Sequence, residues 1–162
     1  EEATLRDLAR QLNVLAPVDT SPGVAFAGWL SQAQCAQRLR DSDCLVLPSI
    51  LECGGAVVLE AMAMGKPVIA TAWGGPLDYL DSSCGILVPP RSADALVEGL
   101  AAAMVRLAAS PQERAELGRA GRAKVLREYD WDVKVARMLE IYAEAMRRSD
   151  RGSSDTRRNV RR

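Results

Sequence analysis

The chain has 162 residues, of which 48% are hydrophobic and 4% aromatic, so it fits one domain with an aliphatic core. Lys plus Arg equals Asp plus Glu at 21 each, so no overall field favours nucleic acid or a membrane. There is no His, which removes the commonest acid/base group and metal ligand.

The cysteines and the chain ends also carry information. Cys35, Cys44, Cys53 and Cys84 show no C-x-x-C spacing, so we predict reduced, mostly buried thiols in a cytoplasmic protein and no zinc site. No apolar run approaches the ~18 residues of a membrane-spanning helix, and no signal peptide opens the chain. The first residue is Glu and a helix-like pattern begins at once, so we expect a piece of a longer protein.

Helix and strand patterns alternate from the start of the chain. A leucine repeat at helical spacing follows Thr4, which we predict to be the N-cap of a first helix. Residues 24–28 have the pattern of a short strand. Ser31 and Gln34 form a capping-box signature for the next helix, which we expect to end near Asp41.

Three continuous apolar runs are typical of parallel strands that are buried on both faces. They are residues 44–47, 68–71 and 85–88. An apolar helix lies between the first two, with Gly65 and Pro67 as its stop signals. A short helix at 76–80 lies between the last two. This alternation predicts an α/β domain with a Rossmann-like parallel sheet flanked by helices.

The C-terminal part of the chain is helical in pattern. Three helices without intervening strands occupy 92–148, with Ser92, Ser110 and Asp130 as expected N-caps. We therefore predict a folded domain over 1–148 and a disordered Arg-rich tail over 149–162, since that composition cannot bury enough apolar surface to order itself. The tail either contacts anionic lipid headgroups at a membrane surface or is simply solvated.

A candidate ligand site lies in the segment between the strand at 44–47 and the apolar helix. In an open parallel sheet, ligands bind at the carboxyl ends of the strands. The amides of Gly54, Gly55 and Ala56 are donors at the start of the helix, suited to phosphate or sugar hydroxyls. Glu52 lies beside them. It is either a ligand group or a charge that stabilises the helix dipole.

Glu60 is the only polar side chain between Ala56 and Met64. A carboxylate in so apolar a helix either faces solvent or awaits a partner, because burying an unpaired charge is costly. A vicinal diol would be a suitable partner, since it supplies two O–H donors.

The wider motif resembles the signature of family 4 of the retaining glycosyltransferases, whose members have a two-domain GT-B fold. It reads Pro48-Ser49-x-x-Glu52-x-x-Gly55-x-x-x-x-Glu60-Ala-Met-Ala-x-Gly65-x-Pro67-Val-Ile-Ala-Thr71-x-x-Gly74-Gly75. The resemblance covers roughly residues 4–146. It implies the C-terminal, donor-binding half of a GT-B fold, truncated at its N-terminus. Where most members have Glu-x-Phe-Gly, this chain has Glu52-Cys53-Gly54-Gly55, which leaves the sugar preference open.

The resemblance also implies roles for individual residues. Glu52 is similar to the first carboxylate of the E-x7-E motif, which contacts the donor sugar and supports catalysis. The amides of Gly54, Gly55 and Ala56 resemble those that hold the sugar and phosphate, and Glu60 resembles the carboxylate that binds the ribose. A candidate base loop, with no clear base code, is formed by Gly28, Trp29 and Leu30. Family chemistry needs no metal, so we expect neither a metal nor another cofactor.

Two functions follow from these observations. The first is a glycosyltransferase fragment that binds a nucleotide-diphosphate sugar. The resemblance implies that it is silent without the N-terminal acceptor domain and without a cationic segment upstream of residue 1 that holds the diphosphate. In the fold's usual strand order, two further strands would separate 24–28 from 44–47, so we expect unpaired strand edges there. The second is a non-catalytic, transferase-like module that docks onto a partner chain.

Overall fold

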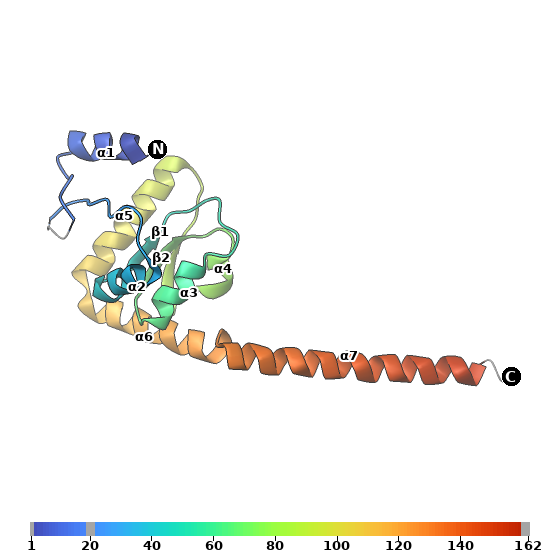
Figure 1. The fold of residues 1–162 in the computed structure, drawn as a ribbon. Helices are drawn as coiled ribbons and strands as arrows, with labels where there is room; N and C mark the ends of the chain where they lie inside the picture. The colour runs from blue at the N-terminus through green and yellow to red at the C-terminus, as the bar shows by residue number, and fades with distance from the viewer. Residues whose placement is uncertain (1, 19–21, 160–162) are drawn as a thin grey trace. The chain divides into compact units, whose positions relative to one another are not determined.

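The computed structural model describes residues 2–18 and 22–159, and the side chains as far as Arg148. It divides into two parts, 1–38 and 39–162, each described here by itself. The first contains α1 (Glu2–Gln11) and the start of α2 (Gln32–Asp41). The second contains β1 (Leu45–Leu47), α3 (Ala56–Ala63), β2 (Val68–Thr71), α4 (Pro76–Tyr79), β3 (Gly85–Val88), α5 (Ala93–Ala109), α6 (Pro111–Glu128) and α7 (Trp131–Asn159) (Figure 1).

The three predicted buried strands form one parallel sheet in the order β1-β2-β3. Leu45 pairs with Val68, and Val68 pairs with Gly85 on its other side. Every residue of β2 is buried, three of them with no exposed surface at all. The prediction of a parallel sheet flanked by helices is therefore confirmed.

Alternate residues of β2 face opposite layers, as the pleat of a strand requires. Val68 and Ala70 pack into a core with Val58 and Met62 of α3. Ile69 packs into a second core on the other face. The helical members of that second core are Leu100, Ala103 and Leu107 of α5 and Leu117 of α6. The sheet is thus covered on both faces, which explains why its strands lack alternating polar residues.

Most of the predicted helix caps are present. Ser31 and Gln34 form the reciprocal capping box, with N···O distances of 2.8 and 3.3 Å. The Ser92 hydroxyl accepts a hydrogen bond from the amide of Ala95, and Ser110 and Asp130 cap the following helices in the same way. The prediction for Thr4 is wrong, because α1 already includes Glu2.

Residues 24–28 are not a strand. Within the described residues, only Val24 is bridged, to Leu15, and Gly28 has a left-handed φ of 68°. A strand forms only where a neighbouring strand exchanges backbone hydrogen bonds with it. Residues 24–28 have one such bridge, at Val24. Two further strands were expected between 24–28 and β1. Among the strands described, β1 pairs only with β2, so its other edge has no strand neighbour there.

The cysteines and the C-terminal segment also depart from expectation. All four cysteines are free, but only Cys84 is buried, while Cys35 and Cys53 are exposed. In the structure α7 continues to Asn159, so the backbone of 149–159 is helical where a disordered tail was predicted. No Pro interrupts this stretch, so the helix can extend through it even though Gly152 and the neighbouring Ser, Asp and Thr residues are poor helix formers. Residues 160–162, and the side chains that would contact lipid, lie outside what is described.

One ion pair fastens the turn before β3 to α6. Lys124 Nζ lies 2.7 Å from a carboxylate oxygen of Asp81, and the amide of Ser83 donates to the other oxygen at 2.9 Å. The hydrogen bond from Lys124, and then those from Ser83, hold the pKa of Asp81 well below its usual range.

We predict that Asp81→Asn lowers the free energy of unfolding at pH 7 by about 1 kcal/mol or less, because the pair is half-exposed. A carboxyl whose pKa is depressed by folding stabilises above its unfolded pKa of about 3.9, and this contribution is lost as the pH falls. Urea unfolding at pH 7, 5 and 3 should show a difference between wild type and variant that is constant at first and shrinks below about pH 4. An undiminished difference at pH 3 would contradict this account of Asp81.

Candidate functional site

Two loops meet where β1 and β2 end. Because the strands are parallel, their carboxyl ends lie at the same edge of the sheet. The loop 48–55 leads from β1 into α3, and the loop 72–75 leads from β2 into α4. The residues predicted for the donor site lie in the first loop and in α3.

Glu52 holds the start of α3. One oxygen of its half-buried carboxylate accepts a hydrogen bond from the amide of Gly55 at 2.8 Å. Gly55 is buried and has a left-handed φ of 60°, which a residue with a side chain adopts at a cost. The Gly55 amide, predicted to face a ligand, is therefore already engaged. The exposed amides of Gly54 and Ala56 have no acceptor among the described residues.

The Gly74-Gly75 pair lies directly against this loop, a contact that sequence analysis missed. The Gly75 amide donates to the carbonyl oxygen of Cys53 at 3.1 Å. A Cβ atom on Gly74 would lie 2.1 Å from the carbonyl oxygen of Glu52, and one on Gly75 would lie 2.1 Å from that of Gly54. The only signal in the sequence was the Gly-Gly pair itself, which follows a strand within the same motif.

Glu60 lies on the solvent side of α3. The helix buries Val58, Ala61 and Met62 against the sheet and exposes Glu60. The carboxylate has no hydrogen-bond or ion-pair partner in the part of the chain that is described. An apolar helix can carry this charge because water solvates it, so the carboxylate is free for a ligand. Among the described residues, no hydrogen bond joins Glu60 to Glu52.

The predicted base loop belongs to the N-terminal part, 1–38. Gly28 has a left-handed φ, Leu30 is half-buried, and Trp29 is 99% exposed. Within this part Gly28 and Trp29 border a hollow, and Leu30 does not line it. Its lining residues are Glu2, Leu5, Ala25, Phe26, Ala27, Gly28 and Trp29.

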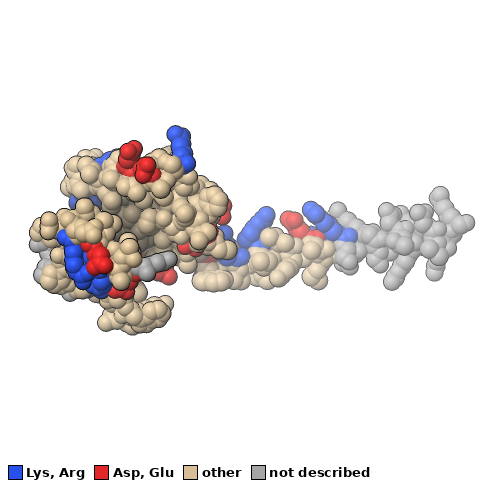
Figure 2. All heavy atoms as spheres, turned by 90° about the horizontal axis from the view of Figure 1, so that it is seen from above, with Lys and Arg blue, Asp and Glu red and all other residues tan. Residues whose placement is uncertain are grey.

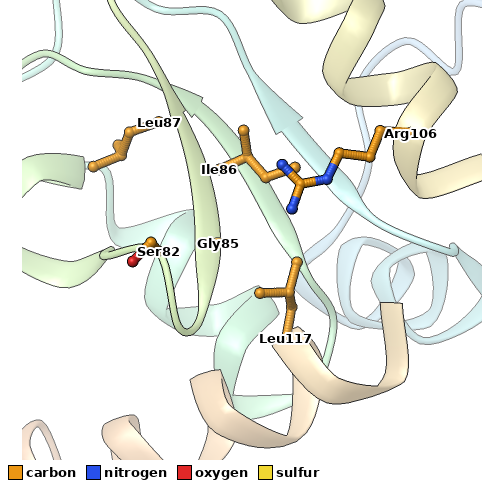
Figure 3. A pocket seen from close by; sticks show the side chains of 6 residues that line it. All are labelled: Ser82, Gly85, Ile86, Leu87, Arg106 and Leu117. Atoms are coloured by element: carbon orange, nitrogen blue, oxygen red, sulfur yellow. The ribbon is translucent and has the colours of Figure 1, made fainter. Parts of the chain in front are cut away.

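A second hollow, of about 370 Å³, lies along β3. Its lining residues are Ser82, Gly85, Ile86, Leu87, Arg106 and Leu117. In Figure 3 the Arg106 side chain reaches from α5 toward Ile86. The Arg106 guanidinium also pairs with Glu113, which raises the pKa of the arginine. This hollow contains none of the predicted donor-site residues.

The charges and possible metal ligands give no further site. On the face seen in Figure 2, acidic and basic side chains lie interspersed. No group of three or more His, Cys, Asp or Glu side chains is placed to hold a metal ion among the residues described. Metal-free donor binding stays a prediction. Of the helices described, none is long and apolar enough to cross a membrane.

We predict that Glu52→Ala and Glu60→Ala have different effects on folding. Glu52→Ala leaves the buried Gly55 amide without its acceptor, which should lower the free energy of unfolding by about 1–2 kcal/mol. Glu60→Ala removes an exposed, unpartnered charge and should change it by less than about 0.5 kcal/mol. Glu52→Gln, which keeps an acceptor oxygen, should lie between them. Urea unfolding measures these changes. An equal decrease in the free energy of unfolding of the two alanine variants would contradict the assignment of Glu52 as the group that holds the start of α3.

Comparison with known proteins gives a consistent picture. The family profile described as Glycosyl transferases group 1 matches residues 1–124. The chain is 37% identical to a D-inositol 3-phosphate glycosyltransferase of Streptomyces bingchenggensis, over 88% of this chain and 29% of that protein. It is 33% identical to a GDP-mannose-dependent mannosyltransferase of Corynebacterium glutamicum that acts on a monoacylated phosphatidylinositol monomannoside, over 86% of this chain and 35% of the relative. The chain thus spans about a third of the length of these curated relatives.

Solved structures agree with this assignment. Sucrose-phosphate synthase from Thermosynechococcus elongatus superposes with a TM-score of 0.69 at 30% identity, over 89% of this chain and 34% of the synthase. The C-terminal domain of a glycosyl transferase group 1 family protein from Francisella tularensis gives a TM-score of 0.65 at 25% identity, over 80% of this chain and 63% of that domain. The chain therefore belongs to the glycosyl transferases group 1 family, and its sheet and helices correspond to the C-terminal domain of the GT-B fold.

Proposed function

We propose that this chain forms the donor-binding half of a glycosyltransferase that transfers a sugar from a nucleotide-diphosphate sugar with retention of configuration. One observation supports this most strongly. At the carboxyl edge of the sheet, Glu52 holds the Gly55 amide and leaves the neighbouring Gly54 and Ala56 amides open. Open amides at a helix N-terminus favour an anion or a polyol. Membership of family 4, inferred from the E-x7-E spacing, supplies the retaining stereochemistry.

In this proposal Glu52 uses its two oxygens differently. Oε1 accepts from Gly55, and the other oxygen remains free to accept from a sugar hydroxyl. The amides of Gly54 and Ala56 then hold the sugar or its phosphate. Glu60, further along α3, accepts from the two ribose hydroxyls. Each of these contacts uses a group that has no partner among the described residues.

The donor is proposed to bind without a metal, with the leaving diphosphate held by amides and by cationic groups elsewhere in the intact protein. One relative is named as GDP-mannose-dependent, which makes GDP-mannose a sensible first probe. The acceptor is proposed to bind to the other domain of a two-domain enzyme. We accordingly expect the 162-residue chain by itself to transfer no sugar.

Calorimetric titration with GDP-mannose, UDP-glucose and ADP-glucose tests this function. Glu60→Gln, which keeps the shape of the side chain but removes its charge, should weaken binding of the preferred donor about ten- to a hundred-fold, since hydrogen bonds to a charged group are among the stronger ones. Glu98→Gln, an exposed carboxylate on α5 outside the site, is the matched control and should bind as wild type does.

Two results would count against the proposal. A wild-type chain that binds none of the three donors at millimolar concentration would contradict it. Equal affinities for wild type and Glu60→Gln would remove Glu60 from the site, and would favour the docking module that tolerates this substitution.

A further inference from the structure

We propose that Gly75 is a positioning residue for donor binding, because its missing side chain allows the loop after β2 to hold the loop after β1 in its binding geometry. This inference rests on the proposed function, since the groups held in place are Glu52 and the amides of Gly54 and Ala56.

Gly75 is required for space and not for backbone conformation. Its φ of −52° and ψ of −38° are right-handed helical values that any residue adopts. A Cβ atom at this position would lie 2.1 Å from the carbonyl oxygen of Gly54, 2.6 Å from its carbonyl carbon and 2.9 Å from its Cα. All three atoms belong to the backbone, so no side-chain rotation can relieve the clash.

A hydrogen bond also joins the two loops. The Gly75 amide donates to the carbonyl oxygen of Cys53, one residue after Glu52 and one before Gly54. Glu52 is tied in turn to Gly55. A shift of the Cys53–Gly54 backbone therefore moves both the carboxylate and the open amide of Gly54.

The difference in burial between the two loops determines which of them is displaced by a clash at position 75. Pro76, next to Gly75, is fully buried, and its Cδ lies 3.2 Å from where a Cβ of Gly55 would be. The amides of Leu77 and Asp78 bond back to Gly74 and Gly75 at 3.0 and 2.9 Å. Cys53 and Gly54, by contrast, are exposed. The clash in Gly75→Ala is therefore relieved by displacing the loop after β1, which carries the donor-binding groups.

The chain contains a matched control for this substitution. A Cβ on Gly118 of α6 would lie 2.0 Å from the carbonyl oxygen of Gly65, an equally severe clash with backbone. Gly65 follows α3 and precedes β2, at the opposite edge of the sheet from the donor loops. Gly118→Ala thus introduces an equally severe backbone clash at the C-terminal end of α3, away from Glu52 and the Gly54 and Ala56 amides.

The test compares wild type, Gly75→Ala and Gly118→Ala in the 162-residue chain, by calorimetry with GDP-mannose, UDP-glucose and ADP-glucose well below each midpoint of unfolding. Gly75→Ala should weaken binding of the preferred donor by at least about tenfold, the equivalent of one misplaced hydrogen bond to a charged group. Gly118→Ala should stay within about twofold of wild type. Ligand-free amide spectra should show shifts at Gly54 and Gly55 in the first variant and near Gly65 in the second.

The outcomes separate the two proposals. Donor binding by wild type that persists unchanged in Gly75→Ala, or falls equally in both variants, overturns the role of Gly75. A wild type that binds no donor overturns the proposed function, and this inference with it. If Gly75→Ala does not fold, amide hydrogen exchange of the wild-type chain, measured with and without donor, tests the coupling of the two loops. Donor binding should slow exchange of the Gly75 amide, and an unchanged rate would overturn the coupling of the two loops.

Discussion

The complete burial of β2 is the constraint on which the rest of the structure depends. Val68 and Ala70 face α3 and Ile69 faces α5, so this part of the strand must be apolar on both faces and both layers must be present. A parallel neighbour on each edge pairs with its backbone groups, which burial has removed from water. Because parallel strands end together, the loops that follow β1 and β2 meet at one edge of the sheet. The candidate site is a consequence of that packing.

Backbone atoms, more than side chains, shape this site. Gly74 and Gly75 lack the Cβ atoms that would separate the two loops, and Gly55 adopts a left-handed conformation that opens the start of α3. Glu52 completes the arrangement by holding the Gly55 amide. The result is a set of backbone groups at the start of α3, with the Glu52 carboxylate engaged and the Glu60 carboxylate without a partner among the described residues. Such a surface suits a ligand with hydroxyls and phosphates, whose recognition depends on many directed hydrogen bonds.

Local patterns predicted the elements well and their contacts poorly. The strands β1, β2 and β3 were recognisable because each is a short apolar run with turn or cap signals at its ends. The state of 24–28 could not be predicted, because a strand depends on neighbours that are distant in sequence. The burial of Cys53 was misjudged for the same reason.

In the candidate site, too, residues within one motif could be predicted, and contacts between segments distant in sequence could not. Glu52, Gly54, Ala56 and Glu60 were predicted as site residues from the motif around the start of α3, and their role in binding stays a prediction. The engagement of Gly55 by Glu52 was missed, although they are only three residues apart, because a carboxylate beside a helix start can bind either its own backbone or a ligand. The contact of Gly75 with Cys53 links two loops separated by a helix and a strand, and no periodicity encodes it.

Donor binding where β1 ends can be mapped by the amide chemical shifts of the wild-type chain with saturating GDP-mannose. We expect the largest changes at Gly54 and Ala56, at the start of α3, with smaller ones at Gly75. The hollow along β3 provides an internal comparison, since Ile86 and Arg106 should hardly respond. Changes concentrated at Ile86 and Arg106, with none at Gly54 or Ala56, would place the donor in the hollow along β3 and not where β1 ends.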